Sequence, residues 1–408
     1  MGNLSIIKEK LQSHKVALVG SPEAIAKYYT KAKHRVERFF VLERESLESE
    51  SLMCFDNIKT DMFGEDKLDI YYYVLCSGEN VTFDKMVKAL ENNGLFNIYN
   101  FVEMNIASAA MQDKKIMCFL GTAFLKQIAT ALSTVPDITC KYLILYFPFS
   151  EIMMGFIDRF LECKNCIEFS ELLVYSNCKD INYLNNLTES AKLRISVTDI
   201  YFRGYFPQLS EDRKQYSDYL YRERKRTKIN YSTYYFAKHD ENILKFCFEG
   251  LNEKQIVSQI LSNSFYDESE LEKLFETEIT KVKEIDKDSD IKLAKLIVNN
   301  RKCYPINLEE WSNDTVIEVA KQIIDLLHME ISINENVMEE QIENTKGSTL
   351  PIYPCIRERY DLMQSYDNLI MLSYTKREKL DINDYLHRQI EYLYTAINMN
   401  RFLFGQEE

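Results

Sequence analysis

The chain has 408 residues, of which 46% are hydrophobic and 28% charged, and its formal net charge is −13. This length exceeds what one ordinary core holds and the composition is that of a globular protein, so we expect two domains and an appendage rather than disorder. The acidic balance argues against nucleic acid as a partner, because phosphate binding needs clustered Lys and Arg. The one basic run, residues 222–228, is expected to be a solvated helix face.

No stretch approaches the roughly 20 apolar residues of a membrane span, and the N-terminal segment lacks the apolar core of a signal peptide. We therefore expect a cytoplasmic protein with no integral membrane segment. The ten cysteines are too sparse for a disulfide framework and are expected to be reduced thiols. Cys163 and Cys166 form a CxxC pair, but no second pair follows at metal-binding spacing, so no metal is expected.

Residues 1–110 alternate short apolar runs with amphipathic segments, which predicts a small Rossmann-like α/β domain. The expected strands are 16–20, 39–42 and 70–76, and the expected helices are 23–33 and 84–93. The first strand ends in Gly-Ser-Pro-Glu-Ala rather than in GxGxxG, so the glycines for close pyrophosphate approach are mostly absent. A structural or docking role is therefore favoured over nucleotide binding for this domain.

Residues 101–113 are the expected boundary to a second α/β domain with a parallel sheet, at 111–330. Its expected strands are 116–120, 142–147, 172–175 and 195–202, with helices at 124–133 and 152–163. Beyond residue 242 the pattern becomes helical, with helices expected at 254–261, 268–288, 291–299 and 315–327. Residues 331–408 are expected to form a helical C-terminal extension that packs on the second domain, with a loop at 344–354 and a closing helix at 381–404.

A glycine turn inside the second domain carries no strong nucleophile. The apolar strand 116–120 breaks at Gly121 and enters a helix through Thr122, Ala123 and Phe124. Such a junction directs backbone N–H groups and the positive end of the helix dipole at whatever lies above it. An anion could therefore bind at this turn without being chemically changed.

Several segments, taken together and in order, resemble the WcbI family of polysaccharide-biosynthesis proteins. They are LGTAF at 120–124, YFRGYFPQ at 201–208, HDENI at 239–243, NSFYDESELEK from 263, DSDIKLAKLI from 288, EEWSND at 309–314 and LPIYPCIRERYDL from 350. The likeness covers residues 115–390 and leaves the N-terminal domain outside. It implies an α/β fold and an acetyltransferase-like protein that binds coenzyme A.

The departures from the family pattern fall on its reactive groups. The family turn reads Gly-Asn-Cys-Gln, with the cysteine proposed as the reactive group, and this chain has Ala123 in its place. A thiolate is nucleophilic near neutral pH, especially at a helix N-terminus, whereas alanine can accept no acyl group. Thr122 offers a hydroxyl that would need an adjacent base, and the alternative is that it caps the helix.

The candidates for a general base also depart from the family. Its Asn-His-Pro before the late helix corresponds here to Glu310-Trp-Ser-Asn, so Glu310 could act as a base only if burial raised its pKa. The alternative is a capping role in which Ser312 or Asn313 starts the helix. His239 is the one histidine inside a family-like segment, and the alternative for it is that it precedes a structural turn.

The best binding candidate is the turn after the strand at 195–202. Gly204 would allow close backbone approach and Arg203 offers a planar donor fork for phosphate or carboxylate, while the alternative is that Tyr205 and its neighbours fill the core. Lys126 could neutralise a phosphate or face solvent. The expected binding residues are Gly121, Thr122, Ala123, Lys126, Arg203, Gly204, Tyr205, Ser312 and Asn313.

Two functions follow as hypotheses. The resemblance implies an acyltransferase-like protein of surface polysaccharide or glycan biosynthesis, with coenzyme A, acetyl-CoA or a nucleotide-sugar as ligand and a glycan precursor as partner. The altered cysteine and histidine positions favour the alternative of a catalytically inactive relative that binds a ligand or acts as a scaffold. The sequence leaves the oligomeric state open, a homo-oligomer included.

Overall fold

The structure is a computed structural model. It describes residues 4–32, 34–41, 53–54, 71–77, 83–92, 101–149, 157–177, 189, 191–209, 240–307, 309–367, 369–372 and 377–404. By their internal contacts the residues form two compact units. Unit 1 comprises residues 1–197 and 323–338, and unit 2 comprises residues 198–322 and 339–408. The expected three-part division, with boundaries after residues 110 and 330, stays a prediction.

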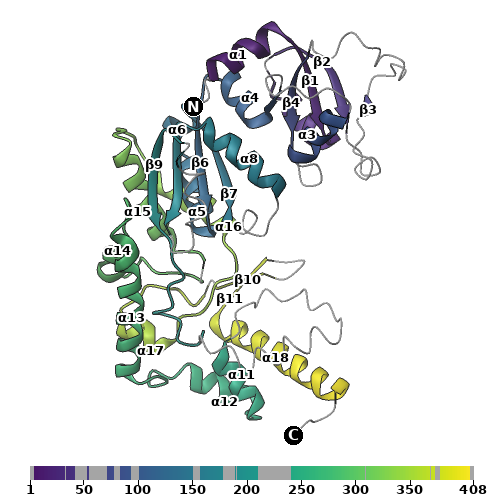
Figure 1. Ribbon diagram of the computed structural model, residues 1–408. Coiled ribbons are helices and arrows are strands. Elements are labelled where there is room, and N and C mark those ends of the chain that lie inside the picture. The colour runs from purple at the N-terminus through teal and green to yellow at the C-terminus, as the bar shows by residue number, and fades with distance from the viewer. Residues whose placement is uncertain are drawn as a thin grey trace. The chain divides into compact units, whose positions relative to one another are not determined.

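The first half of unit 1 is a doubly wound sheet (Figure 1). Its elements are α1 (Leu4–Ser13), β1 (Lys15–Gly20), α2 (Pro22–Tyr29), β2 (Val36–Val41), β3 (Met53–Cys54), β4 (Tyr71–Cys76), α3 (Phe83–Asn92), β5 (Phe101–Glu103) and α4 (Met104–Met111). The strand order is β3-β2-β1-β4-β5, with β1 parallel to β2 and β4, and β3 antiparallel to β2. Helix α2 is shorter than the expected 23–33, because Thr30 closes it by donating its N–H to Ala26 O.

Strand β1 is buried on both faces, as its continuous apolar run requires. Leu18 belongs to the core that includes Ile25 of α2, whereas Val19 belongs to a second core with Met86 of α3. Helices therefore cover both faces of this sheet, which confirms the expected α/β class.

Residues 101–113, expected to be a boundary, are part of the core. They form β5 and α4, and Glu103 caps α4 by accepting the N–H groups of Asn105 and Ile106 at 2.6 and 3.2 Å. The small side chains Ala107 and Ala110 are buried, so α4 packs closely and its hydrophobic core extends from the first sheet to the second. Whether a domain boundary falls at residues 101–113 stays a prediction, but the segment is a strand and a packed helix in this structure.

The second sheet of unit 1 carries the glycine turn. Its elements are β6 (Lys115–Gly121), α5 (Ala123–Ser133), α6 (Pro136–Thr139), β7 (Tyr142–Pro148), α8 (Ile157–Glu168), β8 (Leu172–Asn177) and β9 (Leu193–Thr198). The strand order is β7-β6-β8-β9, and β6 is parallel to both of its neighbours. Strand β9 ends at Thr198 rather than at residue 202, where the backbone N–H of Thr198 donates to Ile291 O at 3.0 Å and its hydroxyl donates to Asp286 Oδ1 at 2.6 Å.

The remaining elements are mostly helical. They are α11 (Glu241–Phe248), α12 (Glu253–Ile260), α13 (Glu268–Asp286), α14 (Ala294–Asn299), α15 (Asn313–Leu326), α16 (Glu335–Thr345), α17 (Pro354–Arg359), β10 (Leu369–Leu372), β11 (Arg377–Leu380) and α18 (Ile382–Phe404). On α15, Val316, Val319 and Ile323 are buried, whereas Leu326 at its end is 45% exposed. An antiparallel hairpin, β10 with β11, adds a small sheet that the sequence did not predict.

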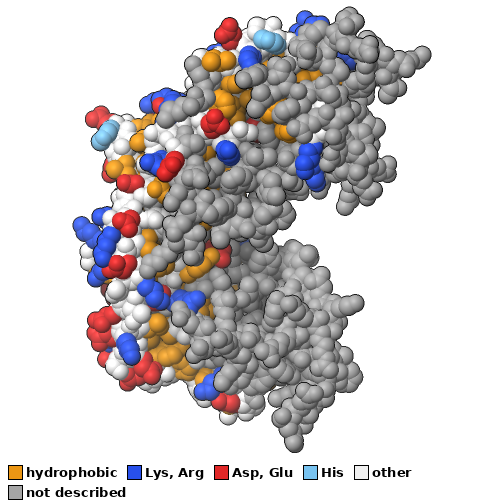
Figure 2. Space-filling model, viewed as in Figure 1, with side chains coloured by type: hydrophobic (Ala, Val, Ile, Leu, Met, Phe, Trp, Pro, Cys, Tyr) orange, Lys and Arg blue, Asp and Glu red, His pale blue; other side chains and the backbone are white. Residues whose placement is uncertain are grey.

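Acidic and basic side chains are interspersed over the visible face of the described residues (Figure 2). Within these residues no helix is long and apolar enough to cross a membrane, and no group of three or more His, Cys, Asp or Glu side chains could hold a metal ion. The basic run at 222–228 lies outside the part of the chain that is described.

Candidate functional site

The turn at Gly121 joins the central strand of the second sheet to α5. Thr122 has extended backbone angles, φ −79° and ψ −175°, and its Oγ1 accepts the N–H of Phe124 at 3.2 Å. Tyr146 of β7 donates its hydroxyl to the carbonyl oxygens of Gly121 and Thr122 at 3.1 and 3.0 Å. The turn is therefore fixed from the helix side and from the neighbouring strand.

Glycine at 121 leaves room for two neighbouring side chains. A Cβ at this position would lie 2.0 Å from Ser176 Oγ of β8 and 2.8 Å from Cδ1 of Leu125. Neither distance is tolerated between non-bonded atoms, so both side chains would have to move if position 121 carried a methyl group.

The turn lies where the strand order reverses direction. The connection from β6 through α5 leads to β7 on one side, and the connection through α8 then leads back to β8 on the other side. Right-handed crossovers place these two helices on opposite faces of the sheet, and open α/β sheets commonly bind ligands at the carboxyl ends of the strands at such a point. Thr122 and Ala123 are half-buried there and Lys126 is exposed on α5, so four predicted binding residues come together in unit 1.

The turn from Arg203 to Tyr205 lies in unit 2 and is held by α13 and α14. The backbone N–H of Arg203 donates to Glu278 Oε2 at 3.1 Å, and the Tyr205 hydroxyl donates to Ile297 O at 3.4 Å. A Cβ at Gly204 would lie 2.5 Å from the Phe202 ring, so glycine serves packing here as well. Tyr205 is 2% exposed and burial raises its pKa, so its phenol remains neutral.

Glu310 is a buried clamp between two loops. Both of its carboxylate oxygens accept the N–H of Gly347, at 2.9 and 2.7 Å, and Oε2 also accepts from Asn307 Nδ2 at 2.6 Å. Burial raises the pKa of Glu310, because the loss of water outweighs the hydrogen bonds that favour its charged form. The carboxyl therefore has the raised pKa that a general base would need, but its oxygens are already used by the fold.

Ser312 and Asn313 start α15. Ser312 O accepts the N–H of Val316 at 3.1 Å and its Oγ accepts the N–H of Thr315 at 3.4 Å, so Ser312 caps the helix. The Ser312 hydroxyl itself donates to Lys302 O at 2.6 Å. Asn313 is the first helical residue, and its Oδ1 is buried with no hydrogen-bond partner in the described residues.

Two of the three predicted turns meet within unit 2. The rings of Phe202 and Trp311 have centroids 6.4 Å apart, so the Arg203 turn and the Glu310 turn share an aromatic contact. Gly121 belongs to unit 1, and the expected convergence of all three turns on one cleft stays a prediction. His239 lies outside the described residues, while Asp240 after it caps α11 by accepting the N–H of Asn242 at 3.0 Å.

A pocket of about 480 Å³ in unit 2 was not predicted as such. Tyr205 is the only residue predicted for a binding site that lines it among those the structure describes, and α13, α14 and the turn after α17 supply the rest. The sequence did contain a signal, since the consecutive polar residues Asn299, Asn300 and Arg301 directly follow an amphipathic helix.

Comparison with known proteins gives one distant structural likeness. No protein-family model matches the chain, and none of the curated proteins matches it. A solved structure of WcbI, described as a polysaccharide biosynthesis enzyme, is similar with a TM-score of 0.49 at 13% sequence identity, over 71% of this chain and 94% of that one. That structure is the native protein without a disulfide bond between coenzyme A and one of its cysteines.

Proposed function

We propose that this protein binds a phosphate-bearing carrier, coenzyme A or a nucleotide-sugar, at the turn between β6 and α5, and that it serves polysaccharide assembly by binding rather than by acyl transfer. The observation that carries the proposal is the Gly121–Ala123 turn. It combines a helix N-terminus, a strand's carboxyl end and a small residue where a nucleophile would be needed.

An anion is the ligand class that this turn favours. The first turn of α5 directs partial positive charge at the space beyond the carboxyl end of β6. The half-buried Ala123 places no bulky side chain at this end of the helix. Lys126 adds a full positive charge one turn further along the same helix. A pyrophosphate or a phosphate ester would be stabilised by both.

The role in polysaccharide assembly is supported by the ordered segments that resemble the WcbI family. Those segments extend over both units, including the Gly121 turn, the Arg203 turn and the Glu310 turn. Arg203, Gly204, Tyr205, Ser312 and Asn313 of unit 2 remain proposed as binding residues.

Acyl transfer by the protein itself is a second candidate, and the raised pKa of Glu310 favours it. A buried carboxyl with a perturbed pKa is a functional-site signal. Against it, Thr122 Oγ1 is engaged in capping α5 and Glu310 in clamping Gly347. Release of free thiol from acetyl-CoA above background, abolished by Glu310→Gln, would establish the second candidate over the first.

Isothermal titration calorimetry with coenzyme A, acetyl-CoA and a uridine diphosphate sugar tests the binding proposal. Lys126→Glu should raise the dissociation constant of the ligand about tenfold, equivalent to about 1.4 kcal/mol. The substitution replaces an attractive charge near the phosphates by a repulsive one. Lys141→Glu is the matched control, since Lys141 is equally exposed but precedes β7 at the amino edge of the sheet.

The outcomes separate the parts of the proposal. Equal loss of affinity in Lys126→Glu and Lys141→Glu would show a general charge effect and would contradict a site at the turn. If none of the three ligands gave a heat of binding, the proposal that the protein binds a phosphate-bearing carrier would be wrong. Weaker binding in Arg203→Ala would extend the site to the second turn, as the sequence predicts.

A further inference from the structure

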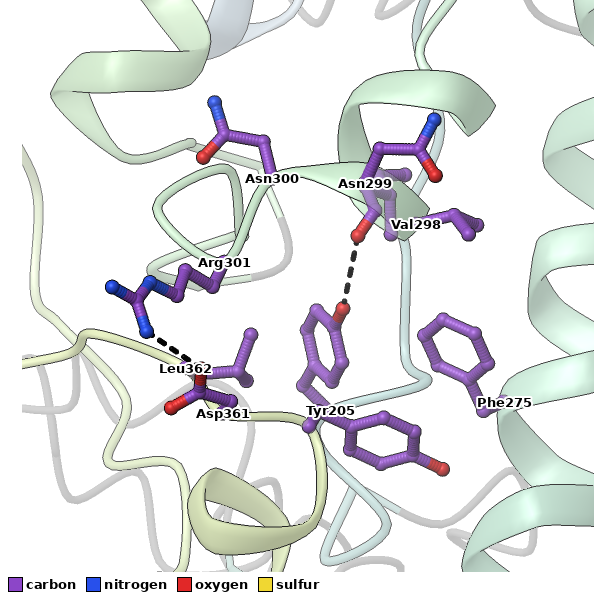
Figure 3. A pocket seen from close by; sticks show the side chains of 10 residues that line it. Tyr205, Phe275, Val298, Asn299, Asn300, Arg301, Asp361 and Leu362 are labelled. Carbon is purple, nitrogen blue, oxygen red and sulfur yellow. Dashed lines mark hydrogen bonds and ion pairs between the residues drawn. The ribbon is translucent and has the colours of Figure 1, made fainter.

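One wall of the unit 2 pocket is aromatic (Figure 3). The centroid of the Tyr205 ring lies 5.5 Å from that of Phe275 and 5.4 Å from that of Tyr360, and Phe275 stacks on Tyr360 at 4.7 Å. These side chains come from three separate segments, so only the folded unit brings them together.

The two tyrosine rings are fixed by their hydroxyls. Tyr205 donates to Ile297 O of α14, and Tyr360 donates to Leu271 O of α13 at 3.1 Å. Tyr205 is 2% exposed and backs the wall, so the half-buried rings of Phe275 and Tyr360 are the ones that offer a ligand their faces and edges. Burial raises the pKa of both phenols, so this wall carries no charge.

The opposite side of the pocket is polar but balanced in charge. Arg301 Nη1 donates to Asp361 Oδ2 at 2.7 Å, and Figure 3 shows this pair beside the aromatic wall. The backbone is tied at the same place, because the N–H of Met363 donates to Arg301 O at 3.1 Å. Asn299 and Asn300 stand at the α14 rim, where Asn300 Oδ1 accepts the N–H of Lys302 at 3.0 Å, so Asn300 adds a donor and Asn299 both a donor and an acceptor.

The shape and the charge narrow the class of ligand. The volume falls within the usual range of small-molecule sites, about 300–1,000 Å³. A phosphate is disfavoured because the Asp361 carboxylate, 2.7 Å from Arg301 Nη1, places a negative charge beside the guanidinium. A flat base is disfavoured because Tyr205 and Tyr360 are inclined by 59° and form no parallel slot.

We infer that this pocket binds a neutral sugar ring. The C–H groups of a puckered ring carry partial positive charge and fit against the negative faces of the aromatic wall. Its hydroxyls, each both donor and acceptor, match the mixed set formed by Asn299, Asn300 and the Arg301–Asp361 pair. The inference goes beyond the carrier site, since it concerns a different ligand and residues of unit 2 alone.

Saturation-transfer NMR with methyl glycosides of glucose, galactose, mannose and N-acetylglucosamine tests the inference on the full chain. At least one of them should bind, and Val298→Trp should abolish that binding by filling the pocket from its lip. Val298 is 54% exposed, so the larger side chain need not disturb the core. Val337→Trp is the matched control, because Val337 is 40% exposed on α16 and does not line the pocket.

A second variant tests the aromatic wall. Phe275→Leu keeps an apolar side chain at a half-buried position but removes the ring face. It should lower the affinity for the glycoside at least fivefold. Lys126→Glu should leave glycoside binding unchanged, which keeps this test separate from the carrier proposal. Binding of uridine or adenosine in place of the glycosides, binding of none of them, or equal binding in Val298→Trp would overturn the inference.

Discussion

Gly121→Ala is the sharpest test of the turn at the end of β6. The new Cβ would lie 2.0 Å from Ser176 Oγ and 2.8 Å from Leu125 Cδ1, so the serine must rotate or the two strands must separate. Overpacking of this kind costs about 1–3 kcal/mol, offset by about 0.4–1 kcal/mol because alanine restricts the unfolded chain. We expect a net loss of about 1–2 kcal/mol in the free energy of unfolding.

The cause can be isolated with a double-mutant cycle. Ser176→Ala removes the oxygen that the new methyl group would strike, and by itself it should cost about 1 kcal/mol as a lost buried hydroxyl. In that background Gly121→Ala should cost little, since its methyl group occupies the space that Oγ leaves. The coupling between the two sites should therefore be about 1–2 kcal/mol and favourable.

Native-state hydrogen exchange measured on peptides covering residues 115–125 reports the stability of the turn directly. Trp311, the one tryptophan of the chain, lies in unit 2 and provides an internal control. Its fluorescence midpoint in urea should not move with Gly121→Ala. Additivity within about 0.5 kcal/mol would refute the steric argument, as would a Gly121→Ala protein as stable as the wild type.

Two further predictions concern the residues considered for catalysis. Thr122→Ala should lower the stability of α5 by about 1 kcal/mol through loss of its cap, with Thr122→Ser as the control that keeps it, and neither should change acetyl-CoA hydrolysis from background. Glu310 should make stability depend on pH, because burial raises its folded-state pKa above the ordinary value of 4.5. The contribution of the Glu310 carboxyl to the free energy of unfolding is then fully present below pH 4.5 and is lost as the pH rises through the raised pKa. Urea titrations from pH 4 to 8 should therefore show that wild type loses stability relative to Glu310→Gln. Wild type gaining stability relative to Glu310→Gln as the pH rises would contradict this sign.

Local patterns in the sequence predicted most strands and helices of the α/β sheets. The continuous apolar run of β6 and its break at Gly121 predict a buried parallel strand and a turn, and the structure confirms both. The alternation around β1 and β4 was equally informative. Helix α4 escaped prediction because its buried face is made of alanines, which give almost no hydrophobic periodicity.

Long-range partners were not predictable from one sequence. Glu310 finds Gly347 37 residues away, and nothing local distinguishes that clamp from a general base. The pocket combines Tyr205, Phe275 and Tyr360, which lie far apart in the chain and are joined only by packing. The hairpin of β10 and β11 was missed because its strands have only four residues each.

Binding and catalysis place different demands on this scaffold. An anion site at the end of β6 needs only backbone N–H groups, a glycine and a small neighbour, and Gly121 and Ala123 supply these whatever the other side chains are. Catalysis needs a nucleophile and a base within about 2.6–3.2 Å of their targets, with atoms available to react. Thr122 Oγ1 accepts from Phe124, and the Glu310 oxygens accept from Gly347, so both groups are held in place by bonds that serve the fold. If acetyl-CoA turnover were found to survive both Thr122→Ala and Glu310→Gln, its chemistry would have to come from other residues, and the proposal of a binding site at the turn would be unaffected.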